Sequence, residues 1–312
     1  MVGSAIYRAL KKEGFENIIR RTHAELDLTK QNDVSVFFES EKPDYVFLSA
    51  AKVGGILANS SYPAEFIYQN LMIENNVIHS AHTSGVDKLL FLGSSCIYPR
   101  NCSQPMKEEF LLTDTLETTN EAYAIAKIAG IKMCQSYYHQ YGSNFISVMP
   151  TNLYGPNDNF DLETSHVLPA LICKFHDAKI AWEKSKDESR DDITVNIWGT
   201  GKPKREFLHV DDMANACVYV MNQVDAPDLY DQSITHLNIG AGKDISIAEL
   251  SQLIKDIVGF QGDIDYDTDK PDGTPRKLLD VSRMQRLGWQ AKIGLKKGIA
   301  DTYNWYLKEI SQ

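Results

Sequence analysis

The sequence predicts an α/β fold in which a doubly wound, mostly parallel sheet is followed by a smaller α/β domain. Short apolar runs alternate with amphipathic stretches through the first half of the chain, which is typical of a parallel sheet with helices on both faces. The runs expected as buried strands are 16–20, 44–50, 88–95 and 144–150. The stretches expected as helices are 3–14, 30–41, 64–84 and 121–141.

The second half of the chain has a more mixed pattern. The expected strands are "ITVNIWG" (193–199), "REFLHV" (205–210) and "HLNIG" (236–240). The expected helices are 167–178, 211–224, 246–258 and 295–309. The charged stretch 179–194 is predicted as a solvated loop. We therefore divide the chain into a first domain over 1–165 and a second over 166–312, with a segment of the second able to return to the first.

Composition and charge limit the classes of function. A chain of 312 residues, 43% hydrophobic and 24% charged, is long enough for one large α/β domain or two modest ones. Its net charge of −10 argues against a nucleic-acid partner. We expect neither a membrane span nor a signal peptide, because no apolar run is long enough for either. Five scattered cysteines without a CxxC motif indicate a reduced, cytoplasmic protein without a metal site.

The chain opens with "MVGSAIYRAL", where Gly3 and the stretch after it are typical of the last glycine and the helix of a dinucleotide-binding turn. In such a turn a buried strand and earlier glycines come first, and the helix N-terminus faces a pyrophosphate. We therefore expect the first, central strand of the sheet to be missing from this sequence, and Gly3 to belong to a cofactor site.

Ligands in a doubly wound sheet bind at the carboxyl ends of the strands, so the residues that follow each apolar run are candidates. Arg20 and Arg21 come at the end of the run 16–20. An arginine at this place suits the 2′-phosphate of NADP, whereas an acidic residue suits NAD. The alternative is a pair of solvated surface arginines. After the next run, Ala50 and Ala51 are small enough to allow a ligand close to the backbone, or a helix close to the strand.

Ser94 lies at the end of the run 88–95, and Tyr123 and Lys127 lie one turn apart on the helix expected at 121–141. A serine hydroxyl can hydrogen-bond a substrate carbonyl, and a tyrosine can exchange a proton with it. An ammonium group beside the phenol favours the phenolate, so we expect the pKa of Tyr123 to be lowered towards neutral pH. These three side chains together predict a carbonyl reductase.

The spacing of this tyrosine and lysine is not specific by itself. The same YxxxK spacing occurs at Tyr7 with Lys11 and at Tyr266 with Lys270. Tyr123 differs in that its helix follows a strand ending in two serines. On that context we favour a catalytic pair over a surface pair.

Five blocks, in order along the chain, resemble the GDP-L-fucose synthase family of extended short-chain dehydrogenase/reductases. They are "GSSCIYP", "AYAIAKIAG", "MPTNLYGP", "REFLHVDDMA" and "KPDGTPRKLLDVSR". Members of that family use NADPH to make GDP-L-fucose from GDP-4-keto-6-deoxy-D-mannose, inverting C3 and C5 and then reducing the C4 ketone. The resemblance implies an oxidoreductase and epimerase with a Rossmann-type NADP-binding domain over 1–165 and a mainly substrate-binding domain over 166–312.

The resemblance also implies catalytic roles. Ser94, Tyr123 and Lys127 would serve the reduction, with Lys127 also on the nicotinamide ribose. Cys96 would be the base and His166 the acid of the epimerisation. Thiol and imidazole groups titrate near neutral pH, as proton exchange next to a ketone requires. Considered alone, Cys96 would be a core residue and His166 a histidine at a helix start.

Further residues are implied as binding residues. The cofactor NADP(H) would be held by Gly3, Arg20, Arg21, Ala50, Ala51, Leu92, Gly93, Ser95, Lys127, Pro150, Asn152, Leu153 and His166. The GDP-sugar would be held by Lys174, Trp198, Arg205 and Asp272. Asp272 lies in a turn-like segment and could equally have a purely structural role. Helices 64–84 and 121–141 would form the interface of a homodimer.

Two departures and two alternatives accompany the resemblance. His23 stands where family members carry a long basic side chain, which weakens the 2′-phosphate site unless Arg20 or Arg21 compensates. The stretch 179–194 is longer than in the family. The alternatives are an NADP-dependent reductase or epimerase of another nucleotide sugar, and a non-catalytic nucleotide-sugar-binding protein. Cys96 disfavours the related 4,6-dehydratases and 4-epimerases, which carry acidic or small residues there.

Overall fold

A computed structural model describes residues 1–162, 164–185, 190, 192–270 and 272–311. Its main sheet has the strand order β1 (Tyr45–Leu48), β2 (Lys88–Leu92), β3 (Phe145–Pro150) and β7 (Leu237–Ile239), all parallel. All residues of β2, β3 and β7 are buried. Continuous burial on both faces explains why these strands are apolar without alternation. The strands expected at 44–50, 88–95 and 144–150 are therefore confirmed.

Helices cover both faces of this sheet, which confirms the doubly wound prediction. On one face, α1 (Val2–Lys12) and α7 (Val210–Gln223) pack on Leu90 and Leu92 of β2. On the other face, Leu89 and Phe91 of β2 pack against α2 (Gln31–Glu41), α4 (Pro63–Thr83) and α5 (Glu121–Tyr141). Alternate side chains of one strand thus enter two separate cores.

The strand expected at 16–20 is not formed, and that prediction is wrong. β1 has a ladder with β2 alone, and the amide of Ile18 donates to the carbonyl of Glu16 instead of to a strand. A groove separates residues 17–22 from β1, so no neighbouring backbone lies at ladder distance. An apolar pattern alone cannot form a strand without that neighbour.

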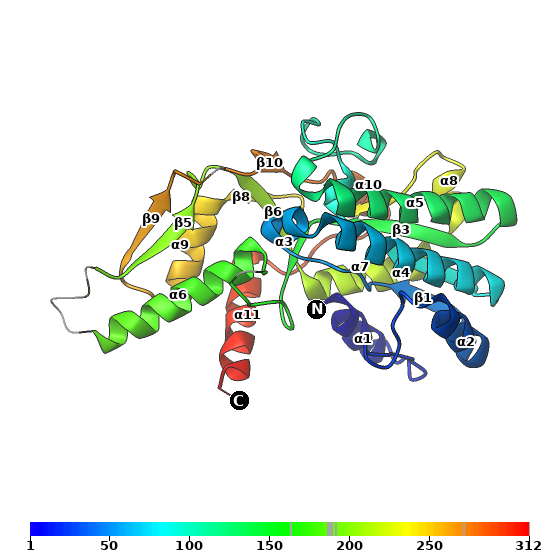
Figure 1. Cartoon of the computed structure of the whole chain (residues 1–312), viewed down its shortest axis with the longest axis horizontal. Coiled ribbons are helices and arrows are strands. Elements are labelled where there is room, and N and C mark those ends of the chain that lie inside the picture. Colours follow the sequence, from blue (N-terminus) through cyan, green and yellow to red (C-terminus); the bar gives the residue numbers. More distant parts are fainter. Residues whose placement is uncertain (163, 186–189, 191, 271, 312) are drawn as a thin grey trace.

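The second lobe has its own core between α6 (Val167–Lys184), α9 (Ile247–Val258), α11 (Leu295–Glu309) and the parallel pair β5 (Thr194–Trp198) and β9 (Asp263–Asp267). Figure 1 shows these elements gathered beside the sheet lobe. Because α6 continues to Lys184, the loop prediction is wrong for 179–184. Within the rest of that stretch, 186–189 and 191 lie outside the described residues.

A small sheet lies between the two lobes. β6 (Lys204–His209) pairs in parallel with β4 (Asn152–Tyr154) and β10 (Arg276–Lys277), and antiparallel with β8 (Asp244–Ser246). The remaining helices are α3 (Ile56–Ser61), α8 (Ala226–Tyr230) and α10 (Ser282–Arg286), with short 3₁₀ turns at Ser95–Ile97, Glu108–Phe110 and Thr118–Asn120. Since α7 and β7 pack in the first core, a segment of the second half does return there; the boundary at 165 stays a prediction.

Candidate active site

The site is built on the carboxyl end of β2. The backbone amide of Gly93 donates to the carbonyl of Val148 on β3 at 2.9 Å. A Cβ atom at position 93 would lie 2.2 Å from Cε of Met149, so any larger residue here would displace the Met149 side chain. Ser94 follows in an extended conformation, and the 3₁₀ turn Ser95–Ile97 then turns the chain across the sheet edge. The turn presents Ser94 and Cys96 on the same side as α5, against which it packs.

Ser94, Cys96 and Tyr123 form one cluster. The Ser94 hydroxyl lies near both the Tyr123 phenol and the Cys96 thiol, and it lowers the pKa of each. Desolvation is the larger effect, so the pKa of Tyr123 stays well above its usual value and that of Cys96 is also raised. The sequence correctly predicted that these side chains meet.

The predicted lowering of the Tyr123 pKa is wrong for this structure. Lys127 is buried, and its ammonium lies 5.9 Å from the centroid of the Tyr123 ring. It instead donates to the carbonyl of Leu92 at 3.1 Å and lies 2.9 Å from Oε1 of Glu74. After desolvation, the nearby charges of Cys96 and Glu74 raise the pKa of Tyr123 further. The phenol is therefore set up as a proton donor.

Two charged residues that the sequence did not single out lie at this site. Glu74 of α4 is buried and faces Lys127. Lys277 of β10 lies close enough to Cys96 to lower the pKa of the thiol, while burial lowers its own pKa. The sequence offered no clear signal for Glu74, because a glutamate within an amphipathic helix is usually solvated. Lys277 offered no signal, since its burial depends on packing between the lobes.

The turn that carries Cys96 is anchored by Tyr98. The Tyr98 hydroxyl donates to Oδ1 of Asn238 at 2.5 Å and lies 2.7 Å from Nε2 of His236. All three side chains are buried. Burial lowers the pKa of His236 to about 3, so the ring is neutral and donates from Nε2 to the Tyr98 oxygen. Thr235 Oγ1 lies 2.8 Å from Nδ1 on the other side of the ring.

His166 occupies the N-cap position of α6. His166 is exposed to solvent, yet desolvation by the surrounding protein lowers the pKa of its imidazole ring. The carbonyl of Thr164, two residues earlier, accepts a hydrogen bond from the amide of Gly55, which places this segment against the loop after β1. No hydrogen bond or ion pair joins His166 to Cys96 within the described ranges. The two epimerisation residues expected from the sequence are therefore not in direct contact here.

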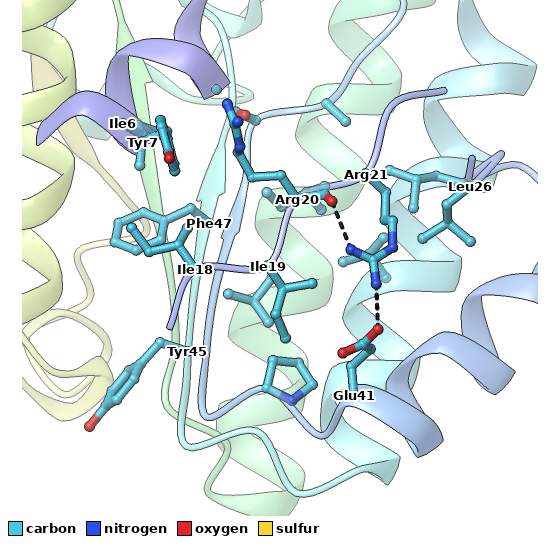
Figure 2. A pocket seen from close by; sticks show the side chains of 18 of the residues that line it. Ile6, Tyr7, Ile18, Ile19, Arg20, Arg21, Leu26, Glu41, Tyr45 and Phe47 are labelled. Atoms are coloured by element: carbon cyan, nitrogen blue, oxygen red, sulfur yellow. Dashed lines mark hydrogen bonds and ion pairs between the residues drawn. The ribbon is translucent and has the colours of Figure 1, made fainter. Parts of the chain in front are cut away.

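A groove of about 1660 Å³ runs between α1, residues 17–29 and β1. It is lined by Gly3, Arg20, Arg21, Ala50 and Ala51 of the predicted cofactor residues. Figure 2 shows Arg20 extending toward Tyr7, and its guanidinium lies 3.7 Å from the Tyr7 ring centroid. Arg21 donates to the carbonyl of Arg20 at 2.9 Å and forms an ion pair with Glu41.

The residues of this groove fit a dinucleotide phosphate. Small side chains at Gly3, Ala50 and Ala51 leave space at the carboxyl end of β1, and the first turn of α1 lacks a side-chain cap on its amides. The guanidinium of Arg20 forms no ion pair with any of the described residues, which leaves it available to a phosphate. His23 is 85% exposed and 4.0 Å from Asp27, so it adds little to this end of the groove.

The remaining predicted cofactor residues lie at the carboxyl ends of β2 and β3. The carbonyl of Leu92 accepts a hydrogen bond from the Lys127 ammonium, and Ser95 is the first residue of the 3₁₀ turn. Pro150 ends β3, and Leu153 of β4 packs on the first core. The Asn152 amide donates to the carbonyl of Glu206 at 2.7 Å. These residues connect the sheet edge with the second lobe.

The predicted substrate residues lie on the second lobe. Trp198 at the end of β5 is 65% exposed, and the ammonium groups of Lys174 and Lys270 lie 6.0 and 5.6 Å from its ring centroid. Lys174 also donates to the carbonyl of Asn196 at 3.0 Å. An exposed indole ring flanked by two cations suits stacking and charge pairing with a nucleotide.

Arg205 and Asp272 meet at the small sheet. Arg205 of β6 donates to the carbonyls of Lys204 and Thr274 at 2.7 and 2.6 Å. Asp272 accepts hydrogen bonds from the amide and the hydroxyl of Thr200 at 2.9 and 2.7 Å, so it fixes the turn after β5. The structural role considered for Asp272 is therefore present in this structure.

Comparisons with known proteins agree with this geometry. Residues 1–240 match the model of the NAD dependent epimerase/dehydratase family. The chain is 56% identical to GDP-L-fucose synthase 1 of Arabidopsis thaliana, over 99% of this chain and 91% of the relative. It is 54% identical to GDP-L-fucose synthase of Escherichia coli K12, over 99% and 94%. Among solved structures, a GDP-mannoheptose C4 reductase from Campylobacter jejuni with NADP bound superposes with a TM-score of 0.88 at 45% identity, covering 98% of this chain and 95% of that chain.

Proposed function

The chain belongs to the GDP-L-fucose synthases of the NAD dependent epimerase/dehydratase family, and from this premise we propose that it converts GDP-4-keto-6-deoxy-D-mannose into GDP-L-fucose. The cluster of Ser94, Cys96 and Tyr123 at one sheet edge is the observation that carries the proposal. It combines a proton donor suited to a ketone with a thiol suited to the adjacent carbon. The activity is an NADPH-dependent epimerisation followed by reduction.

The epimerisation depends on the acidity that the C4 ketone gives to the protons on C3 and C5. Cys96, as the thiolate, removes such a proton, and the electron pair moves onto the C4 oxygen. Ser94 and Tyr123 stabilise that oxygen by hydrogen bonds. His166, as the imidazolium, returns a proton to the opposite face of the carbon, which inverts the centre. Both centres use the same ketone, so one site serves both.

The reduction uses the same ketone after the second inversion. NADPH supplies the hydride when it is bound. Tyr123 donates its phenolic proton to the C4 oxygen, and Ser94 orients that oxygen. Lys127 would hold the ribose of the cofactor, and its ammonium provides a positive charge near the phenolate that Tyr123 leaves behind.

Binding divides between the two halves of the chain. We propose that residues 1–165 hold the NADP(H), with Gly3, Arg20 and Arg21 on its phosphates. The other cofactor residues are Ala50, Ala51, Leu92, Gly93, Ser95, Lys127, Pro150, Asn152, Leu153 and His166. Residues 166–312 mainly hold the GDP-sugar, through Lys174, Trp198, Arg205 and Asp272. The solvent-exposed side chain of Trp198 supports this division.

Incubating the purified protein with GDP-4-keto-6-deoxy-D-mannose and NADPH tests the proposal. We expect loss of NADPH absorbance and formation of GDP-L-fucose, identified by nuclear magnetic resonance. A product reduced at C4 without inversion at C3 and C5 would contradict the epimerase function. No consumption of either substrate would contradict the proposal as a whole.

A second candidate is the reduction of another GDP-sugar. The similarity to a GDP-mannoheptose C4 reductase, at 45% identity, favours this alternative over a UDP-sugar or dTDP-sugar substrate. A panel of 4-keto sugars carried on GDP, UDP and dTDP separates the candidates. The proposed function requires the highest kcat/KM for the 6-deoxymannose derivative, and a higher value for a heptose derivative would favour the alternative.

We further propose a cytoplasmic homodimer. All five cysteines are free thiols, which supports a reducing compartment. No described helix combines the length and the apolar character needed to cross a membrane. α4 and α5 pack side by side and expose Tyr68, Ile125 and Tyr141 to solvent at 62, 42 and 54%. Light scattering with Tyr68→Glu and Ile125→Glu tests the interface, and a dimer unaffected by both would exclude it.

A further inference from the structure

Glu74 lies in the middle of α4 and is buried against α5 at the reductase site. Its side chain is 1% exposed, and that of Lys127 is 2% exposed. Oε1 of Glu74 lies 2.9 Å from the Lys127 ammonium. Apart from this ion pair, neither carboxylate oxygen has a hydrogen-bond partner among the described residues. The negative charge of Glu74 is therefore directed at one residue of the active site.

The space for the Glu74 carboxylate depends on Gly130, which lies about one turn after Lys127 on α5. A Cβ atom at position 130 would lie 2.9 Å from Oε2 of Glu74 and 2.4 Å from Cζ of Phe91. Figure 1 shows α4 and α5 running side by side, and the glycine allows them to approach here. Buried ion pairs often contribute no more to stability than apolar residues of the same volume. Stability alone does not account for placing a buried charge in this slot.

The ion pair determines where the Lys127 ammonium lies. The ammonium is held by Glu74 and by the carbonyl of Leu92, at 2.9 and 3.1 Å. Its distance to the centroid of the Tyr123 ring is 5.9 Å, and to that of Phe91 it is 4.7 Å. The positive charge is thus anchored on the side of Glu74, where its attraction for a phenolate at Tyr123 is partly cancelled by the carboxylate.

We propose that Glu74 is a positioning residue of the reductase, which holds the Lys127 ammonium beside Leu92 and so keeps Tyr123 in the phenol form that can donate a proton. This inference rests on the proposed function. The charged and titratable groups around Tyr123 are Glu74 on α4, Lys127 on α5 and Cys96 on the 3₁₀ turn, and Lys277 on β10 acts in turn on Cys96. Of these, Glu74 is the group whose negative charge touches Lys127.

The test is the pH profile of kcat/KM for reduction by Glu74→Gln, which keeps the shape and removes the charge. Reduction needs the protonated phenol, so the rate falls only where Tyr123 ionises, which in the unchanged protein lies above the ordinary tyrosine value of about 10. Without Glu74 the ammonium is free to stabilise the phenolate. The alkaline limb is therefore expected to move to lower pH by about one unit or more. NADPH deuterated at the transferred position shows, by its isotope effect, that the hydride step is being followed.

Two further variants separate positioning from general damage. Glu74→Asp keeps the charge, so its alkaline limb is expected within about 0.3 pH units of that of the unchanged protein. Glu108→Gln removes another buried carboxylate, one paired with Arg283 away from Lys127, and is expected not to move the limb. Deuterium exchange at C3 and C5 is expected to continue in Glu74→Gln.

An alkaline limb in Glu74→Gln that coincides with that of the unchanged protein would overturn the inference, as would an equal shift in Glu108→Gln. If Glu74→Gln does not fold, the pH of the alkaline limb is measured in Glu74→Met, which has a similar side-chain volume and no charge. Absence of reduction by the unchanged protein would instead contradict the proposed function. The two failures are therefore distinguishable.

Discussion

The Tyr98 hydroxyl donates a hydrogen bond of 2.5 Å to Asn238, joining the turn after β2 to a strand on the far side of β3. Tyr98 lies two residues after Cys96, and both are buried. The amide of Asn238 in turn donates to the carbonyls of Met106 and Asp280 at 2.9 and 3.2 Å. The position of the thiol is thereby tied to β7, an element from the second half of the chain.

Replacing Tyr98 by Phe is expected to slow epimerisation more than reduction. The variant removes the hydrogen bonds to Asn238 and His236, so the turn carrying Cys96 is held less tightly, whereas Tyr123 on α5 keeps its place. We expect deuterium exchange at C3 and C5 to fall by roughly tenfold, as a misplaced catalytic group implies. Nuclear magnetic resonance in D₂O measures the exchange directly.

Tyr230→Phe is the matched control for this variant. It also removes a buried tyrosine hydroxyl, which donates to the carbonyl of Phe145 at 2.8 Å. It is expected to lower stability by about 1 kcal/mol without changing the exchange rate. Equal losses of exchange in the two variants would show that Tyr98 acts through stability alone.

Replacing Cys96 by Ser is expected to abolish exchange at C3 and C5. A serine hydroxyl does not ionise near neutral pH, so it cannot act as the base. In the unchanged protein, burial raises the pKa of the thiol, so the exchange rate should increase with pH as the thiolate forms. Exchange by Cys96→Ser at an unchanged rate would show that another group is the base.

His236 should make the folded state sensitive to acid. Burial lowers its pKa to about 3, whereas the unfolded chain takes up the proton near the ordinary value of about 6.5. This group's contribution is therefore fully present above the unfolded pKa and is lost as the pH falls towards the folded one, by up to about 1.4 kcal/mol per unit.

Urea unfolding at several pH values measures this contribution. His236→Gln, which cannot titrate, is expected to lose less stability than the unchanged protein between roughly pH 6 and pH 4. His23→Gln is the control, because His23 is 85% exposed. Parallel stability curves for the unchanged protein and His236→Gln would mean that His236 is not the group responsible.

The sheet was predictable where burial is continuous along the chain. The apolar runs in β2 and β3 are buried on both faces, and α5 begins and ends at the residues expected. The run at 16–20 contains only two apolar residues and has no neighbouring strand at ladder distance, so it stays irregular. β8 and β10 have three and two residues, too few for a periodic signal. They form because β6 lies beside them.

The active site was predictable where its residues adjoin recognisable elements. Ser94 follows a strand, and Tyr123 lies in the first turn of a helix. The two side chains lie close together in the structure. The pKa of Tyr123 could not be derived in the same way, because it depends first on burial and then on the charges of Cys96 and of Glu74, which is 49 residues earlier in the sequence and on another helix. A charge within an amphipathic helix is usually solvated, and only the packing of α4 on α5 shows that this one is buried.

We propose that one chain carries two separable reactions at one ketone, and the variant Tyr123→Phe separates them. The variant protein is given the 4-keto sugar and NADPH in D₂O, and the sugar protons are followed by nuclear magnetic resonance. We predict that C3 and C5 still exchange, more slowly because Ser94 alone then stabilises the C4 oxygen, while reduction at C4 falls by about 10²–10⁴-fold because its proton donor is lost. Reduction at an unchanged rate, or loss of exchange together with reduction in a folded protein, would contradict the claim.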